Sequence, residues 1–262
     1  GFRTCGQLVD IDAQGVTLTS PATITFECDS SATGGAPIEG VTLFRDGLRV
    51  QDCTGSNDPC VSSRSLQVDG DLVISCDTSN FSPWVVAIND SSISGTVTYG
   101  NPVTGPNPRG VPGVLLSGAG SPAVSDTSAG AGTYSLTGFG LGSYTITPTK
   151  SGGINGAVTS NDSARIAQYI TGNTSLTTAQ QTVADVSGVG GLSSFDAALI
   201  ARYVVSLPPP TGNTGTWIFS PVSNTHLTVP SDITGEDYAG LLMGDVSGNW
   251  GDPSPFRPVV GG

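Results

Sequence analysis

The chain has 262 residues, enough for two or three small domains. The chain has nine basic and 21 acidic residues and a formal net charge of −12. Binding to nucleic acid or to an anionic membrane needs clustered positive charge and is therefore not expected, whereas the negative charge favours binding of divalent cations. Thirty-seven glycines and 18 prolines, with frequent Thr, Ser and Val, predict short strands and turns, and the sequence contains no apolar run long enough to span a membrane.

Residues 1–90 are predicted to form an N-terminal β-sandwich. In ATITFEC the apolar residues alternate onto one face together with Cys28, as expected for a half-buried strand. LQVDGDLVISC indicates a hairpin that turns at Asp69 and Gly70 and returns with Cys76 on its apolar face. No family resemblance is assigned to this region.

Of the possible pairings of the five cysteines, two fit the predicted strands and loop, and the first is favoured. Strand parity directs Cys28 and Cys76 into the same core and predicts a cross-sheet disulfide, while Cys53 and Cys60 bracket a loop short enough to be closed locally. Cys5 would then be left as a free thiol or an intermolecular link. The alternative pairs Cys5 with Cys28 and leaves Cys76 buried and inert. No CxxC pair is present, so a zinc site is not expected.

Residues 91–150 form a second β-rich block. SISGTVTYG, VPGVLLSG and the predicted hairpin GTYSLTGFGLGSYTITPTK alternate in polarity between Gly-rich turns. The block resembles the carboxypeptidase-regulatory or collagen-adhesin B-type sandwich, which implies a rigid spacer in a surface protein. Some members carry a Lys–Asn isopeptide bond. Lys150, the only lysine, lies at the edge of the block and not in its opening strand, so this bond is not expected here.

DVSGVGGLSSFD, residues 185–196, has the spacing of a calcium loop. Such a loop takes ligands from its first, third and fifth residues, a carbonyl from the seventh, often a water held by the ninth, and a carboxylate from the twelfth. Val189 occupies the fifth position without a side-chain oxygen, which predicts a weakened site. The alternative is a polar turn before an ordinary helix. The predicted ligands are Asp185, Ser187, Gly191, Ser193 and Asp196.

Two further clusters are related to this loop. Upstream, GINGAVTSNDSARIAQYITG aligns when Asp162 is set on Asp196, but the loop is shorter and Gly153 replaces the opening aspartate. Its predicted donors are Asn155, Thr159 and Asp162. Downstream, GDVSGNWGD repeats the DVSG opening. Its predicted donors are Asp245, Ser247, Asn249 and Asp252. Three such clusters predict that the chain binds Ca²⁺.

Both loop-like segments lead into predicted helices, which begin at Ser160 and at Ser193 or Ser194. Between them TTAQQTVA carries a Thr-x-x-Gln capping box and predicts a short third helix. Residues 150–250 resemble the type I dockerin, in the variant ending TWIFSPVSN…ITGEDYAGLLMGDVSGNW. This resemblance implies paired calcium loops and a cohesin partner. The chain departs from the dockerin pattern at Gly153, in the shortened first loop and at Val189.

The predicted fold class is mainly β, with two tandem β-sandwich domains followed by a small α-helical, dockerin-like calcium module. The predicted boundaries are 1–90 and 91–150 for the sandwiches, 151–252 for the module and 253–262 for a C-terminal tail.

Catalysis and carbohydrate binding are not expected. The single histidine, His226, lies in a polar loop, and GxSxG, HExxH and phosphate-binding glycine motifs are absent from the sequence. Aromatic residues make up 6% of the chain, too few for an exposed sugar-binding strip, and Trp250 is predicted to close the core of the calcium module.

The sequence therefore predicts a non-enzymatic, calcium-stabilised extracellular structural protein. Its expected partners are copies of itself, joined head to tail by strand addition into a surface fibre, with an unpaired Cys5 as a covalent link. The alternative is an adaptor that binds a cohesin-bearing scaffold. The terminal segments GFRTCG and PFRPVVGG bear on this choice, because ordered ends would indicate a partner or docking onto the chain itself.

Overall fold

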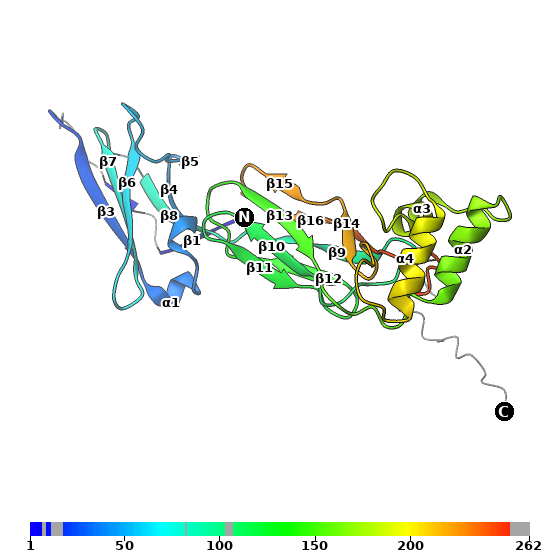
Figure 1. Ribbon diagram of the computed structural model, residues 1–262. Coiled ribbons are helices and arrows are strands. Elements are labelled where there is room, and N and C mark those ends of the chain that lie inside the picture. The colour runs from blue at the N-terminus through cyan, green and yellow to red at the C-terminus, as the bar shows by residue number, and fades with distance from the viewer. Residues whose placement is uncertain (7–8, 12–17, 82, 103–106, 252–262) are drawn as a thin grey trace.

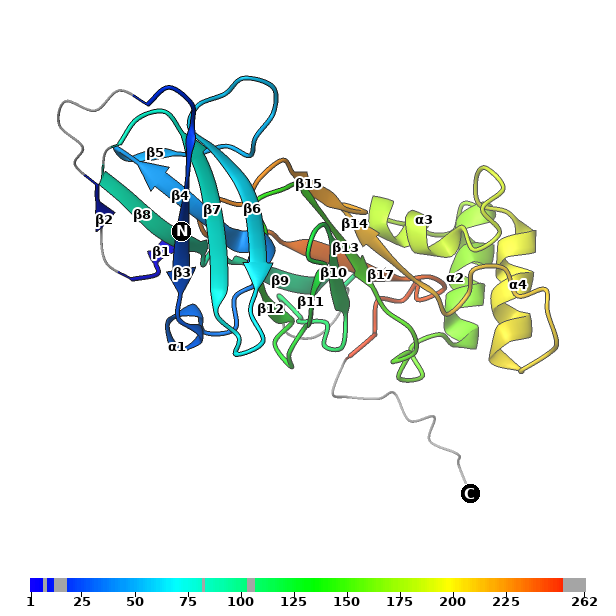
Figure 2. The same cartoon turned by 90° about the vertical axis from the view of Figure 1, so that its left-hand side faces the viewer.

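A computed structural model describes residues 1–6, 9–11, 18–81, 83–102 and 107–251. The chain is mainly β, with two sandwiches and a small helical region arranged in a row (Figure 1). The view in Figure 2 shows the same order, with the helices at the end of the second sandwich remote from the first. The predicted fold class is confirmed. None of the helices in the described ranges is long and apolar enough to cross a membrane.

The described residues of the first sandwich form eight strands, a short helix and a 3-10 turn. They are β1 (Phe2–Thr4), β2 (Val9–Asp10), β3 (Ala22–Cys28), α1 (Ser30–Thr33), η1 (Ile38–Gly40), β4 (Val41–Arg45), β5 (Leu48–Arg49), β6 (Cys60–Leu66), β7 (Leu72–Thr78) and β8 (Pro83–Asn89). One sheet has the order β1-β8-β4-β5, with β2 also on β8, and the other has the order β3-β7-β6. The predicted hairpin is confirmed, since β6 and β7 pair antiparallel around Gly70.

The structure corrects the preferred cysteine pairing. Cys28 faces Leu72 and Cys76 faces Ile24 across neighbouring antiparallel strands. Four residues of register, about 13 Å along a strand, therefore separate two thiols that share a core face. Cys28 is instead bonded to Cys5, and Cys76 is the free cysteine, fully buried.

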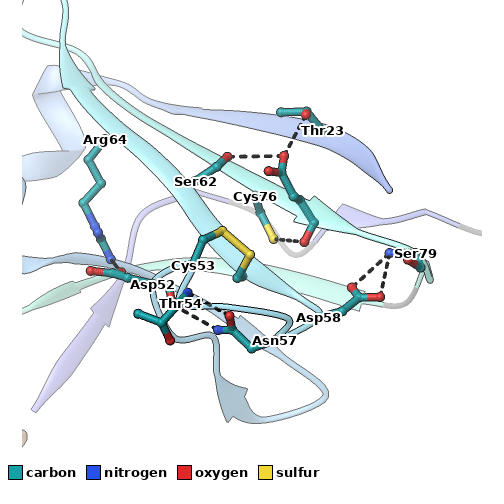
Figure 3. Close-up of a disulfide and its surroundings, with 12 residues drawn as sticks. Thr23, Asp52, Cys53, Thr54, Asn57, Asp58, Ser62, Arg64, Cys76 and Ser79 are labelled. Carbon is teal, nitrogen blue, oxygen red and sulfur yellow. Dashed lines mark hydrogen bonds and ion pairs between the residues drawn. A yellow bond between two sulfur atoms is a disulfide. The ribbon is translucent and has the colours of Figure 1, made fainter. Parts of the chain in front are cut away.

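The predicted local disulfide is confirmed. Cys53 is bonded to Cys60, the first residue of β6, and the disulfide closes the loop before that strand (Figure 3). Asn57 holds this loop from inside: its side chain accepts a 2.8 Å hydrogen bond from the amide of Thr54 and donates one to the carbonyl of Asp52 at 3.0 Å.

The N-terminal segment is ordered by its own chain. Strand β1 pairs with β8, and the ammonium group of Gly1 donates to Ser91 Oγ at 3.0 Å. The disulfide from Cys5 to Cys28 adds a covalent tie. Contacts within the chain therefore explain this end without a partner. The C-terminal segment PFRPVVGG lies outside the described residues.

The second sandwich has nine strands in the part that the structure describes. They are β9 (Ile93–Tyr99), β10 (Leu115–Ala119), β11 (Val124–Thr127), β12 (Thr133–Leu136), β13 (Tyr144–Thr149), β14 (Trp217–Ser220), β15 (Asn224–His226), β16 (Ile233–Thr234) and β17 (Tyr238–Leu242). One sheet has the order β11-β10-β13-β15. The other has the order β12-β9-β17-β14, with β16 also on β9.

Two features of this sandwich differ from the sequence expectation. Strands β12 and β13, expected as one hairpin, lie in opposite sheets. Strands β14 to β17 come from the region assigned to the helical module, yet β17 pairs in parallel with β9 and β15 pairs with β13. The strands next to β9 and β13 in the sequence leave one hydrogen-bonding edge of each without a partner. The chain returns after the helices, and β17 and β15 pair with these edges and complete both sheets.

The helical region contains α2 (Ser160–Ile170), α3 (Thr178–Ala184) and α4 (Ser194–Val204). The predicted caps at Thr177 and Ser193 are confirmed, whereas α2 is capped by Thr159, one residue before the predicted Ser160. Helix α2 lies beside α4, and their buried faces join the core of the second sandwich in one continuous cluster. The helical region is therefore packed onto the sandwich and shares its core.

Candidate metal centre

The loop between α3 and α4 brings together the two predicted carboxylates of residues 185–196. Asp196, the third residue of α4, is fully buried; its Oδ1 accepts the Ser187 amide at 3.0 Å and its Oδ2 accepts both the amide and the hydroxyl of Ser193 at 3.0 Å. Asp185 ends α3, and its Oδ1 accepts the Ser187 hydroxyl at 3.3 Å and the Gly188 amide at 3.0 Å. Ser187 therefore links the two carboxylates. We call this group the intact loop.

The middle of the intact loop is open to solvent. Val189, at the fifth position, has no side-chain oxygen. Its side chain is 75% exposed and contributes little apolar packing. Gly190 and Gly191 follow with φ values of 37° and 93°, in the left-handed region that glycine tolerates. The turn thus has the predicted shape, and Gly191 is exposed at its predicted seventh position.

The downstream cluster folds into a similar turn immediately after β17. Asp245 is fully buried, and its Oδ1 accepts the Ser247 hydroxyl at 3.2 Å, the Gly248 amide at 2.9 Å and the Asn249 amide at 3.2 Å. Gly248 has φ 69°, and the equivalent Gly188 of the intact loop has φ 67°.

The upstream cluster does not assemble by itself. Asp162, the third residue of α2, is fully buried and accepts the Ser247 amide through Oδ1 at 2.6 Å. Its Oδ2 accepts the Thr159 amide at 2.7 Å and hydroxyl at 2.9 Å. Asn155 is an exposed turn residue. The structure therefore brings Asp162 and Thr159 to the downstream segment; Asp252 lies outside the described residues.

The surroundings of Asp245 come from strand β9 and from Trp250. Its Oδ2 accepts the Tyr99 hydroxyl at 2.5 Å, and Asn101 donates to its carbonyl at 2.7 Å. Trp250 is 3% exposed, with ring centroids 5.2 Å from Tyr99 and 5.0 Å from Trp217, which confirms its predicted place in the core. No sequence motif marks Tyr99 and Asn101, so neither residue was predicted to belong to the site.

The buried carboxylates of Asp162, Asp245 and Asp196 differ in the direction of their pKa shifts. Burial raises the pKa of Asp162 although backbone and hydroxyl groups donate to it. Burial also raises the pKa of Asp245; the Tyr99 hydroxyl opposes this, and the charge of Asp162 adds to it. For Asp196 burial acts in the same direction, but the hydrogen bonds from Ser187 and Ser193 outweigh it and lower its pKa.

The donor set fits a hard cation. In the ranges that the structure describes, no three His, Cys, Asp or Glu side chains converge on one point, so a bound ion would depend on hydroxyl, amide and carbonyl oxygens besides two carboxylates. Calcium accepts such a set. The Oδ1 atom of Asn249, shielded from solvent, has no hydrogen-bond partner among the described residues. An unpartnered oxygen beside buried carboxylates fits the role of a cation ligand.

His226 is more enclosed than the sequence predicted. It lies in β15, and its Nε2 is 2.5 Å from Oε2 of the buried Glu236. Tyr238 donates its hydroxyl to the other oxygen of Glu236 at 2.8 Å. This group lies between strands of the second sandwich and contributes to its packing.

Comparison with known proteins identifies one region. Residues 154–205 match the family model of the dockerin type I domain, which confirms the resemblance over α2, α3, the intact loop and α4. A search of curated proteins found no match. The crystal structure of the group B streptococcus pilus 2b backbone protein is similar at 12% identity and a TM-score of 0.21, covering 56% of this chain and 80% of that chain. The carboxypeptidase-regulatory resemblance of residues 91–150 stays a prediction.

Proposed function

We propose that this protein is a non-enzymatic extracellular adaptor, in which a calcium-stabilised dockerin-type module binds a cohesin-type partner and two β-sandwiches carry the module. The dockerin type I match over residues 154–205 is the observation that carries the proposal. The paired DVSG turns, each with a buried aspartate from the start of a helix, support calcium as the cofactor.

An extracellular location is supported by the cysteines. The bonds Cys5–Cys28 and Cys53–Cys60 place four of the five cysteines in disulfides, which persist in oxidising compartments. Extracellular calcium is millimolar, enough to occupy loops of modest affinity. The net charge of −12 also gives the bound form an electrostatic advantage, because calcium neutralises part of it.

A partner surface is available on α4. Phe195, in the first turn of α4, is 55% exposed, and Val205 and Leu207 beyond its last turn are 64% and 48% exposed. Exposed aromatic and aliphatic side chains next to polar loop residues are typical of a protein-binding surface. We place the cohesin contact on this side of the helical region.

The adaptor is tested by binding of the full chain to a purified cohesin domain in millimolar calcium. Phe195→Asp is expected to weaken binding about tenfold or more, as for a residue that contributes roughly 1–2 kcal/mol to an interface. Leu227→Asp is the matched control, since Leu227 is 83% exposed but follows β15 in the second sandwich. Failure of the wild-type chain to bind any of a panel of cohesins would refute the adaptor.

A fibre subunit is the second candidate. Strand β3 is seven residues long and, in the described part of the chain, pairs only with β7, so its outer edge is open to strand addition from another copy. Two expectations that favoured the fibre do not hold. Cys5 is bonded to Cys28 and is not free to link subunits, and β1 pairs within its own chain instead of with a partner. Electron microscopy of native material distinguishes the two: filaments of repeating subunits would favour the fibre, and single particles the adaptor.

A further inference from the structure

The intact loop and the downstream cluster share a set of hydrogen bonds, although the second is assembled from two distant segments. In each, the serine amide of DVSG donates to the third residue of a helix: Ser187 to Asp196 at 3.0 Å, and Ser247 to Asp162 at 2.6 Å. In each, the first aspartate accepts from the glycine of DVSG, at 3.0 Å for Asp185 and 2.9 Å for Asp245.

The turn of residues 245–250 lies where the upstream loop lacks its opening aspartate. Gly153 stands at that position in the sequence, and its carbonyl accepts a 2.7 Å hydrogen bond from Trp250 Nε1. The turn that carries Asp245 therefore lies beside the beginning of the upstream loop. It brings an aspartate and a serine to a helix start whose own loop has neither at the matching positions.

We infer that the protein has a second calcium site split between two segments, with Asp162 from α2 as one half and Asp245, Ser247 and Asn249 from the C-terminal turn as the other. The inference rests on the proposed calcium binding of the module and extends it to residues beyond the dockerin match, which ends at residue 205. The ligand is a hard divalent cation, bound by carboxylate, hydroxyl and amide oxygens.

Burial of two carboxylates supports a cation at this place. Asp162 and Asp245 both have 0% of their surface exposed. In the described part of the chain, the hydrogen bonds that reach them come from backbone amides and hydroxyls, which carry no net charge. Buried charge is costly unless an opposite charge or a metal compensates it. In the intact loop Asp185 is only partly buried, so the need for compensation is smaller there.

Asn249 supplies an oxygen that the intact loop lacks. It holds the fifth position counted from Asp245, where the intact loop has Val189. Its Oδ1 is shielded from solvent without a hydrogen-bond partner among the described residues, whereas Val189 is 75% exposed. The split site thus offers side-chain oxygens at the first, third, fifth and twelfth positions of the calcium-loop pattern.

The split site would connect parts of the fold that the chain separates. Helix α2 carries Asp162, and the turn after β17 carries Asp245, which Tyr99 and Asn101 hold against β9. A cation bound by both halves links the helical region to the second sandwich. Its removal is expected to loosen the packing of α2 and of the C-terminal turn together.

The test is the calcium stoichiometry of the full chain, measured by isothermal titration calorimetry after chelation and dialysis. The wild-type protein is expected to bind two calcium ions. Asp162→Asn and Asp245→Asn, on separate segments, are each expected to remove the same single ion, and the double variant no more than that. Asp185→Asn is the matched control in the intact loop and is expected to remove the other ion.

Asn249→Ala covers the case in which a buried aspartate variant fails to fold. Because the Asn249 oxygen has no partner among the described residues, this change is expected to leave the calcium-free melting temperature unchanged and to weaken one of the two ions. Loss of all binding in the Asp185→Asn variant, with no effect of Asp162→Asn or Asn249→Ala, would overturn the split site and keep the proposed calcium function. No calcium binding by the wild-type chain would overturn both.

Discussion

Ser247 donates its backbone N–H to Oδ1 of Asp162 across 2.6 Å, although 84 residues of chain lie between them. The same contact joins Ser187 to Asp196 within one loop. The repeated DVSG turn therefore pairs with two different helix starts, once locally and once over a long range. If both turns bind calcium, the stability of the helical region is expected to depend on calcium at the starts of both α2 and α4.

Calcium is expected to raise the melting temperature of the protein. A ligand present at 100 times its dissociation constant adds about 2.7 kcal/mol to the free energy of unfolding. Thermal melts followed by circular dichroism, in millimolar calcium and in excess chelator, measure the difference, with magnesium as the control for ionic strength. Equal midpoints in calcium and chelator would contradict calcium binding.

Val189→Asp is expected to tighten calcium binding at the intact loop about tenfold, since a carboxylate near a divalent cation contributes roughly 1–2 kcal/mol at an exposed position. Asp185→Ala should lower the affinity for the same ion. Val189→Ala should leave that affinity unchanged, because this substitution removes no oxygen. Calorimetric titration of the three variants gives the affinities. If Val189→Asp gave no gain, the fifth position would not face the ion.

Cys76 is expected to be inert in the folded protein. Burial raises the pKa of its thiol from 9.0 to about 11, so the reactive thiolate is scarce near neutral pH. Because the folded pKa exceeds the unfolded one, the stability gained from burying the neutral thiol is fully present below about pH 9 and is lost as the pH rises toward 11. Cys76→Ala should remove this alkaline loss.

A colorimetric thiol reagent measures the reactivity of Cys76. No thiol should react in native protein, and one per chain should react after unfolding without reductant, as the free cysteine of the structure requires. Rapid labelling of the native chain would contradict the burial of Cys76.

Removal of the Cys5–Cys28 disulfide is expected to cost about 3 kcal/mol, the loop-closure entropy of a cross-link spanning 23 residues. Urea unfolding of the Cys5→Ala/Cys28→Ala variant measures this, with the fluorescence of Trp84 as a probe, because its ring lies 6.0 Å from Phe26 in the same core. Peptide mapping checks the connectivity independently. A peptide linking Cys28 to Cys76 would contradict the pairing.

Local patterns were sufficient for many features of this protein. Alternating polarity predicted the buried faces of β3 and β7, because side chains on a strand point to opposite sides in turn. The Thr177 and Gln180 capping box predicted α3, and the DVSG spacing predicted the turn before α4, because caps and tight turns are formed by residues close in sequence. Calcium ligation by the residues of the DVSG turn stays a prediction.

Long-range pairing was decided by the tertiary structure alone. Parity placed Cys28 and Cys76 on one core face but carried no information on register, and the register separates them. Strand β17 joins β9 in parallel after the helices, because the open edge of β9 is completed by whichever segment the shared core brings beside it. Asp162 meets Ser247 for the same reason. Sequence by itself determined the turns and caps of this protein, whereas packing decided which of them meet.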